Sequence, residues 1–286
     1  MRHKKKVAQA IYYSSRLRTR LLLGVKERPR RWPPHGYDAL LAHHCDLVRR
    51  FQENAPKSCD FKGKSVCEVG PSDCLSLASL LLGMGAAHVD LVEPSPAIVN
   101  ETQARILEEI KRRGFDLDTT ILRNGSKVSL DGSKVTYHNC FMDKLGLENR
   151  YDYLFSHHVM EHVEGLESFY RDCHKVLKPG GRMFHCIDFS GHSDLEDPVP
   201  PLDFQTYPDW LYRLMYPAFY RATRSFISEH YQAMANAGLV LEDTRVTWRA
   251  EADYLASVWP ELRTKARSLP REEVGILEAV VVSRKP

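Results

Sequence analysis

The chain has 286 residues, of which 43% are hydrophobic and 27% charged, the ordinary balance of a globular protein. This balance excludes global disorder, and no apolar run approaches the roughly 18 residues needed to cross a bilayer. The net charge of +3 conceals an asymmetry, because residues 1–35 carry eleven basic residues against one acid, Glu27. We therefore expect a basic arm over residues 1–35, followed by a mildly acidic domain over residues 36–286.

The basic arm has several interpretations. It is a solvated arm, or it makes peripheral contact with an anionic membrane through residues 1–31, where Lys4, Lys5 and Lys6 suit acidic headgroups. We do not expect nucleic acid as a partner, because no recognisable RNA-binding motif accompanies the charge. An arginine-rich, acid-poor start is also typical of organelle transit peptides, whereas no apolar segment of about 7–15 residues follows it to make a secretory signal.

The seven cysteines are odd in number, scattered, and never spaced as Cys-x-x-Cys. This pattern argues against a zinc ribbon and against a disulfide scaffold. We therefore expect free thiols in a reducing cytoplasmic compartment, with attachment to the inner face of the membrane as the variant that the basic arm allows.

Strand and helix patterns alternate along the chain. Helices are expected over 1–26, 36–51, 72–84, 96–113, 161–177 and 228–237, strands over 65–69, 88–92, 134–140, 151–156, 182–187, 239–247 and 278–283, and an inserted hairpin over 119–133. This rhythm predicts an α/β fold with a doubly wound, seven-stranded, mostly parallel Rossmann-like sheet whose last two strands form an antiparallel hairpin. Residues 190–230 interrupt the rhythm and are expected to form a helical, aromatic-rich lid after the fifth strand.

The turn after the first strand reads Glu68-Val69-Gly70-Pro71-Ser72. Ligands of open α/β sheets bind at the carboxyl ends of strands, and a glycine there permits close backbone approach. A dinucleotide fingerprint is missing, since Ser72 and Leu75 occupy its second and third glycine positions, and Gly-x-Ser-x-Gly is also absent. Glu93 follows the second strand, where a carboxylate can accept hydrogen bonds from both hydroxyls of a ribose.

Two later segments complete a pattern. The fourth strand continues as Ser156-His157-His158-Val159-Met160-Glu161-His162, and the fifth begins after Leu177-Lys178-Pro179-Gly180-Gly181. In order and spacing, residues 60–190 resemble the class I S-adenosylmethionine-dependent methyltransferases. The turn Gly-Pro-Ser-Asp-Cys departs from the family's usual glycine-rich turn and resembles a variant found in members from polysaccharide and natural-product gene clusters.

The resemblance implies roles for individual residues. Glu68 and Gly70 would hold the amino-acid end of S-adenosylmethionine, with Pro71 and Ser72 lining the turn. Glu93 would accept the ribose hydroxyls between Pro94 and Ser95. Cys140 and Phe141 would lie at the adenine, with Asp143 as a substitute for the usual acid, and Ser156 and His157 would contact the methionine portion.

The acceptor side is less specific. An oxygen acceptor benefits from a base near neutral pH, for which His158 and His192 are the candidate catalytic residues and His162 a weaker one. His157, His158 and His162 also raise the question of a metal, but no carboxylate–histidine set has a clear ligand spacing, so no metal ion is expected.

The lid carries seven aromatic residues between Phe204 and Tyr220. Such rings either stack on a sugar or flat acceptor or simply pack on the sheet. Arg213, Arg221 and Arg224 lie among them and can pair with phosphate on a nucleotide-linked or lipid-linked acceptor. We hypothesise that residues 190–230 select the acceptor.

The expected function is methyl transfer from S-adenosylmethionine, at oxygen, to a small molecule, a glycan or a nucleotide-linked sugar, as in polysaccharide biosynthesis. An RNA methyltransferase that uses the basic arm and a non-catalytic binding protein with the same fold are the alternatives. The sequence after the fourth strand, Ser156-His157-His158-Val159, lacks the Asn/Asp-Pro-Pro-aromatic motif of amino-group methylation, which weakens the RNA alternative.

Overall fold

The computed structural model describes residues 36–57, 59–71, 74–97, 99–124, 128–191, 200–215 and 221–286. Seven strands form one sheet in the order β5-β2-β1-β6-β7-β9-β8. Their bounds are β1 (Ser65–Val69), β2 (His88–Val92), β5 (Val135–His138), β6 (Tyr151–His157), β7 (Leu177–Asp188), β8 (Val240–Arg249) and β9 (Ile276–Arg284). β9 pairs antiparallel with β7 and with β8, whereas the other neighbours pair in parallel. The predicted mostly parallel sheet is therefore confirmed.

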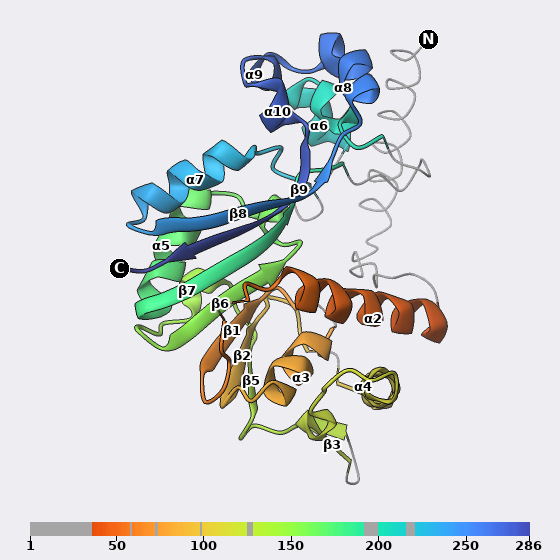
Figure 1. Ribbon diagram of the computed structural model, residues 1–286, viewed down its shortest axis with the longest axis vertical. Helices are drawn as coiled ribbons and strands as arrows, with labels where there is room; N and C mark the ends of the chain where they lie inside the picture. The colour runs from red at the N-terminus through yellow and green to blue at the C-terminus, as the bar shows by residue number, and fades with distance from the viewer. Residues whose placement is uncertain are drawn as a thin grey trace, which may run out of the picture.

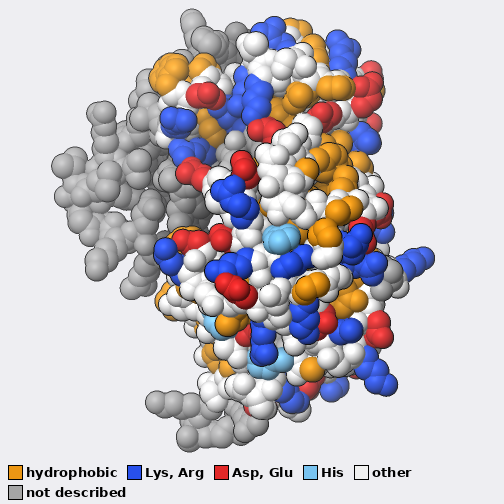
Figure 2. Space-filling model, turned by 90° about the vertical axis from the view of Figure 1, so that its left-hand side faces the viewer, with side chains coloured by type: hydrophobic (Ala, Val, Ile, Leu, Met, Phe, Trp, Pro, Cys, Tyr) orange, Lys and Arg blue, Asp and Glu red, His pale blue; other side chains and the backbone are white. Residues whose placement is uncertain are grey.

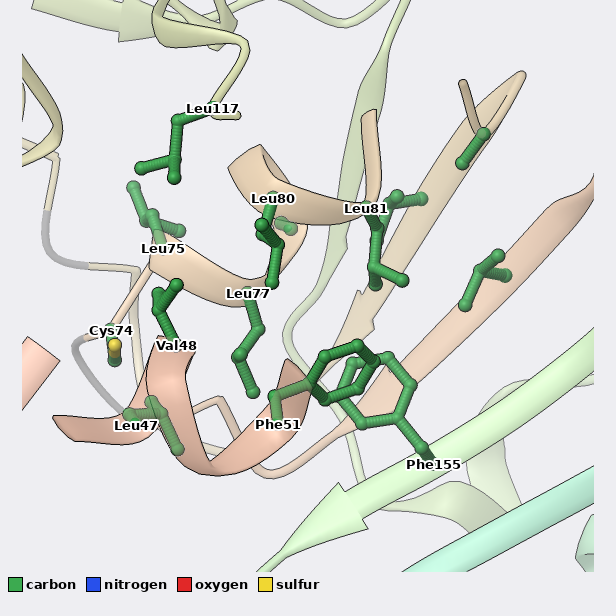
Figure 3. Packing of buried hydrophobic residues seen from close by; sticks show 14 of the residues in the cluster. Leu47, Val48, Phe51, Cys74, Leu75, Leu77, Leu80, Leu81, Leu117 and Phe155 are labelled. Atoms are coloured by element: carbon green, nitrogen blue, oxygen red, sulfur yellow. The ribbon is translucent and has the colours of Figure 1, made fainter. Parts of the chain in front are cut away.

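Helices cover both faces of this sheet (Figure 1). One face carries α2 (Tyr37–Asn54), α3 (Ser76–Gly83) and α4 (Glu101–Arg112), and the other carries α5 (Leu166–Val176) and α7 (Ile227–Asn236). A parallel sheet needs such double cover because its strands are apolar on both faces. Figure 3 shows the first layer, in which Phe51 of α2 packs on Phe155 of β6 with ring centroids 5.2 Å apart.

Three helices begin later than the sequence predicts. α3 begins at Ser76 rather than at residue 72. The side chain of Asn100 accepts a hydrogen bond from the Gln103 N–H, which places the start of α4 at Glu101 rather than at residue 96. Gly165 adopts φ +78° immediately before α5, so the predicted helix from residue 161 is divided into a short 3₁₀ turn, η3 (Met160–His162), and α5. Glu161 therefore lies in a separate turn beside the end of β6.

Two smaller predictions have different outcomes. The inserted hairpin is confirmed as β3 (Leu122–Asn124) and β4 (Val128–Leu130), which pair only with each other. The fifth strand, expected to begin after Gly181, instead begins at Leu177: β7 already pairs with β6 there and resumes the pairing, after a register shift, at Arg182. All seven cysteines are free thiols, as predicted.

The link between β8 and β9 is a correction to the prediction. The sequence predicts no helix there, but α8 (Ala252–Val258), η6 (Trp259–Glu261), α9 (Thr264–Arg267) and α10 (Arg271–Val274) fill it. Their apolar residues, including Val258 and Leu262, form one buried cluster with Leu202 and Phe226. We call these helices, together with η4 (Asp203–Thr206) and α6 (Asp209–Met215), the cap, which lies at the top of Figure 1. The four helices between β8 and β9 are each seven residues or shorter, so their apolar periodicity is too brief to predict a helix from the sequence.

The outer surface and the arm bear on localisation. Figure 2 shows the side formed by α5, α7 and the β8 edge, where basic and acidic side chains are interspersed. Among the described residues no helix is both long and apolar enough to cross a membrane. The basic arm, with the predicted helix over 1–26 and the membrane contact of residues 1–31, lies outside the described residues, so that contact stays a prediction.

Candidate active site

The end of β1 presents a buried carboxyl group. Glu68 is only 4% exposed, and within the described part of the chain its Oε2 has no hydrogen-bond partner. Burial raises the pKa of Glu68 to about 8, because the charged form loses its hydration. A ligand with a positive charge, such as the ammonium group of an amino acid, would compensate this carboxylate and lower its pKa.

Gly70 joins the end of β1 to the end of β6. Its φ is +70°, and a Cβ built at this position would lie 2.4 Å from Cγ2 of Val159, which follows His158 in the next turn. Only glycine fits this conformation and this contact without a shift. Pro71 is buried beside it, and Ser72 lies outside the described residues.

Glu93 comes one residue after β2 on the neighbouring strand. Its Oε1 accepts a hydrogen bond of 2.9 Å from the Ser95 N–H, and the side chain is partly exposed. Asn139 donates to the carbonyl oxygens of Glu93 and Pro94, which fixes the turn against β5. Glu93, Pro94 and Ser95 thus lie at the same edge of the sheet as Glu68, with one carboxylate oxygen occupied by the turn.

The residues predicted near the adenine follow β5. Cys140 is partly buried and Phe141 is 64% exposed, so the Phe141 ring is open to a ligand. Asp143 forms an exposed ion pair of 3.1 Å with Lys144. The structure thus places these side chains at the β5 end of the edge.

Ser156 and His157 point to opposite faces of β6. The Ser156 hydroxyl lies 2.7 Å from Nδ1 of His185 beneath α5, so the structure does not bring it together with Glu68. His157 lies on the α2 side, where burial and then the neighbouring His158 lower its pKa to about 3. Its Nε2 is buried and has no partner among the described residues. His157 is therefore neutral and can still offer one nitrogen.

His158 is held in a charged network. It adopts φ +53°, and its backbone N–H donates to the Cys186 carbonyl oxygen at 2.9 Å. Its ring nitrogen Nε2 lies 2.8 Å from Oε2 of Glu278. Burial lowers the pKa of His158, but the hydrogen bonds of its ring with the side chains of Cys186 and Glu278 outweigh burial and hold the pKa well above 6.5. At neutral pH the ligand-free chain therefore carries His158 as an imidazolium.

Glu278, on β9, completes this network. It is 6% exposed and also accepts hydrogen bonds from Thr247 at 2.6 Å and from Arg50 of α2 at 3.1 Å. Burial raises the pKa of Glu278, but the hydrogen bonds from His158 and Thr247 and the charges of His158 and Arg50 lower it to about 2. Sequence reasoning missed Glu278, since a lone acid in an apolar strand carries no motif.

Two further acids lie beside His158. Glu161 of η3 and Asp188 at the end of β7 each place a carboxylate oxygen near it, so that one ligand atom from each of the three residues lies within 4.8 Å of the others. His162 is exposed, with Nδ1 3.5 Å from the Arg221 carbonyl. His192 lies outside the described residues.

Most of the aromatic rings described in the lid are buried against one another. Phe204, Tyr207 and Tyr212 are buried in one cluster, whereas Trp210 is 69% exposed. Arg224 is 5% exposed and donates to the carbonyl oxygens of Phe204 and Tyr207 and to Asp209, so it is structural rather than open to phosphate. Arg221 pairs with Glu164 and Arg213 is exposed. Tyr216, Phe219 and Tyr220 lie outside the described residues.

Comparison with known proteins agrees with this arrangement. The family model described as a methyltransferase domain matches residues 68–185. No curated protein matches the chain. Geranyl diphosphate C-methyltransferase from Streptomyces coelicolor, solved with Mg²⁺, geranyl diphosphate and S-adenosyl-L-homocysteine, is similar over 89% of this chain and 85% of its own, with a TM-score of 0.51 and 12% identity. An S-adenosylmethionine-dependent methyltransferase from Mesorhizobium loti is 15% identical over 87% of this chain and 100% of its own, with a TM-score of 0.47.

At such identities the shared feature of the solved structures is the fold. The family model matches the chain in sequence as well, from Glu68 near the end of β1 to His185 within β7. This range includes Gly70, Glu93 and the turn after β6. Residues 68–185 thus match a methyltransferase domain in sequence, and the chain shares its fold with S-adenosylmethionine-dependent methyltransferases.

Proposed function

We propose that the protein transfers the methyl group of S-adenosylmethionine to an oxygen of a small molecule, a glycan or a nucleotide-linked sugar. The observation that carries the proposal is the meeting of the two turns, where Gly70 after β1 lies against Val159 after β6. Because β1 and β6 are also adjacent in the sheet, Glu68 and the His157–His158 pair share one carboxyl edge. Ligands of doubly wound sheets bind at such an edge, where the strand order reverses.

The proposed contacts use the side chains and turns at this edge. The buried carboxylate of Glu68 receives the ammonium of the cofactor's methionine portion, with Gly70, Pro71 and Ser72 around it. Glu93 accepts the ribose hydroxyls between Pro94 and Ser95, and Cys140 and Phe141 lie at the adenine. His157 contacts the methionine portion through its neutral ring, whereas Ser156, whose hydroxyl bonds to His185, contributes only its backbone.

Methyl transfer requires mainly that the acceptor be correctly positioned. The sulfonium carries an activated methyl group, so the protein has to hold the acceptor oxygen in line with it. His158 and His192 are the proposed bases. Because the His158 pKa lies well above 6.5, His158 can accept a proton only after the imidazolium has lost its own. A base role for His158 therefore predicts a rate that keeps rising with pH above 7.

Calorimetry with S-adenosylmethionine tests the cofactor site. Glu93→Gln is expected to weaken the affinity roughly 10- to 100-fold, the loss of one or two charge-assisted hydrogen bonds. The matched control is Glu101→Gln, an exposed acid in the first turn of α4, which should bind as the wild type does. Absence of binding by the wild type, or equal binding by both variants, contradicts the proposal.

A labelled-methyl assay tests the acceptor. Sugars, nucleotide sugars, lipids and RNA are offered in parallel, and the product is identified by the mass of one added methyl group. Methylated oxygen on a small molecule or glycan is the expected result. Methylated RNA as the only product would contradict the proposed acceptor class while leaving the cofactor site intact.

A further inference from the structure

A second ligand site lies where β6 and β7 end, beside the proposed cofactor edge. We propose that His158, Glu161 and Asp188 bind a divalent metal ion. One nitrogen or oxygen ligand atom from each residue lies within 4.8 Å of the other two. Ligands about 2.1 Å from one ion lie roughly 3 to 4 Å apart, so small side-chain rotations bring these three onto a common centre.

Burial and charge favour a cation at this position. Glu161 is 3% exposed and Asp188 is half-buried, so both carboxylates lie largely outside bulk water. A carboxylate taken out of water is costly unless a cation or hydrogen bonds compensate it. Asp188 accepts a hydrogen bond of 2.7 Å from the Ser190 N–H through Oδ1, which orients the carboxylate at the end of β7.

The surroundings of His158 match those of a metal-binding histidine. A histidine that binds a metal through one ring nitrogen usually donates the other N–H to a carboxylate, which fixes the tautomer and the ring. Here Nε2 is bonded to Glu278, and Glu278 is itself anchored by Thr247 and Arg50. Nε2 is thus occupied by Glu278, so a cation would bind at Nδ1 of His158, in place of a proton and of the hydrogen bond between the ring and the Cys186 side chain.

His157 supplies an independent observation. Its Nε2 is buried and has no partner among the described residues, and its ring centroid lies 4.1 Å from that of His158. With Cys186 it forms a second group of ligand atoms around His158, again within 4.8 Å of one another. A buried nitrogen without a partner beside the His158 ring is typical of a place that receives an ion or a ligand atom.

The donor set indicates which ions fit. Imidazole nitrogen with carboxylate oxygens suits Zn²⁺, Mn²⁺ or Fe²⁺ better than Ca²⁺ or Mg²⁺, which prefer oxygen alone. This conclusion differs from the expectation from sequence that no metal is bound. The difference arises because Asp188 is 30 residues from His158 along the chain and reaches it only through the pairing of β6 with β7.

A role for the ion at the acceptor rests on the proposed function, whereas metal binding itself does not. An acceptor hydroxyl bound to the ion would have a lower pKa and lose its proton to water or to a base. The oxygen–carbon bond would form as the carbon–sulfur bond breaks, converting the sulfonium to a thioether. The metal keeps its oxidation state throughout.

The test is metal binding by the full chain after treatment with chelator. Mn²⁺ and Zn²⁺ are titrated by calorimetry, and bound Mn²⁺ is also followed by electron paramagnetic resonance. The wild type is expected to bind one ion, and Glu161→Gln and Asp188→Asn to weaken binding more than 10-fold. Glu278→Gln tests the positioning role of that carboxylate and should weaken binding roughly 10- to 100-fold.

Matched controls separate the site from general acidity. Glu164→Gln lies three residues after Glu161 on the surface, paired with Arg221, and Asp243→Asn is exposed on β8. Both should bind metal as the wild type does, and thermal melting in chelator should show that all variants are folded. If Glu161→Gln does not fold, Asp188→Asn carries the test.

Two results would overturn the proposal: wild-type binding no tighter than about 1 mM, or unchanged binding by Glu161→Gln and Asp188→Asn. Calorimetry with S-adenosylmethionine in chelator is measured separately. Cofactor binding without metal binding removes only the metal site, and metal binding without cofactor binding removes only the proposed function.

Discussion

The two halves of the carboxyl edge are built in opposite ways. At β1 and β2, Glu68, Gly70 and Glu93 each lie within one residue of a strand end, so their position follows from the ends of these strands. At β6 and β7, His158 is held by Glu278, which is 120 residues further along the chain, and Glu278 is held by Arg50, 228 residues before it. The first half depends on backbone conformation and the second on tertiary contacts between side chains.

This difference determines how each half fails. A backbone change in the first half displaces a whole turn, because Gly70 has no room for a side chain. Loss of one side chain in the second half leaves several charged partners without compensation, which is expensive in a buried network. The changes in unfolding free energy that substitutions cause should therefore differ between the two halves, both in magnitude and in their dependence on pH.

The largest effect is expected at Gly70. Gly70→Ala and Gly63→Ala form a matched pair, since φ is +70° and +71°, but a Cβ at Gly63 meets nothing within 4 Å. Gly63→Ala should cost about 1 kcal/mol of unfolding free energy, the strain of a positive φ. Gly70→Ala should cost about 3 kcal/mol because overlap with Val159 is added, and it should weaken S-adenosylmethionine binding more than 10-fold. Denaturant unfolding and calorimetry measure both quantities.

A double variant isolates the overlap. Val159→Ala removes the two methyl groups that a Cβ at residue 70 would meet, so Gly70→Ala combined with Val159→Ala should recover most of the excess cost over Gly63→Ala. Equal unfolding free energies for the two single alanine variants would show that the two turns do not depend on close contact.

The second half is tested by pH. The pKa of Glu278 is about 2 in the folded chain and 4.5 in the reference state, so folding stabilises its charged form. This stabilisation is complete above pH 4.5 and is lost as the pH falls towards 2. Between pH 6 and pH 3 the wild type should lose about 2 kcal/mol that Glu278→Gln does not lose. The gap between the two unfolding free energies should therefore narrow with acid.

His158 gives the opposite sign. Its folded pKa is raised, so its contribution is complete below pH 6.5 and is lost as the pH rises through the folded value. In Glu278→Gln this alkaline loss should shrink, because the hydrogen bond and the charge of the carboxylate are gone. A gap between wild type and variant that is constant from pH 3 to pH 9 would show that the two side chains do not titrate as a pair.

The same contrast explains what the sequence reveals. The alternation of strands and helices, the double cover and the edge of Glu68 and Glu93 follow from period, length and position, which are local properties. Glu278 and Asp188 acquire their meaning only when β9 and β6 flank β7, and no spacing along the chain shows that. Ser156 illustrates the converse: its position in the motif suggests a cofactor contact, but the alternation of β6 turns its hydroxyl towards His185.

The cap is the third case. A break in the strand–helix rhythm marks residues 190–230, but the partners of Leu202 and Phe226 are Val258 and Leu262, which lie beyond another strand. Short helices have weak periodicity, so residues 252–274 give no comparable signal. Acceptor selection, if it lies in the cap, therefore involves two segments rather than one.

The smallest effect is expected at the surface of the cap. Trp210 of α6 is 69% exposed and Trp248 of β8 is 48% exposed, so alanine at either position should change the unfolding free energy by no more than about 0.5 kcal/mol. If the cap binds the acceptor, Trp210→Ala should raise the acceptor KM about 3- to 10-fold, the loss of one aromatic stacking contact, and leave the KM for S-adenosylmethionine unchanged. Trp248→Ala should change neither KM. An equal rise of the acceptor KM in both variants would reflect general surface effects. An unchanged acceptor KM in Trp210→Ala would assign acceptor recognition to the β6–β7 edge instead, because the other described rings of α6 and η4 are already buried against one another.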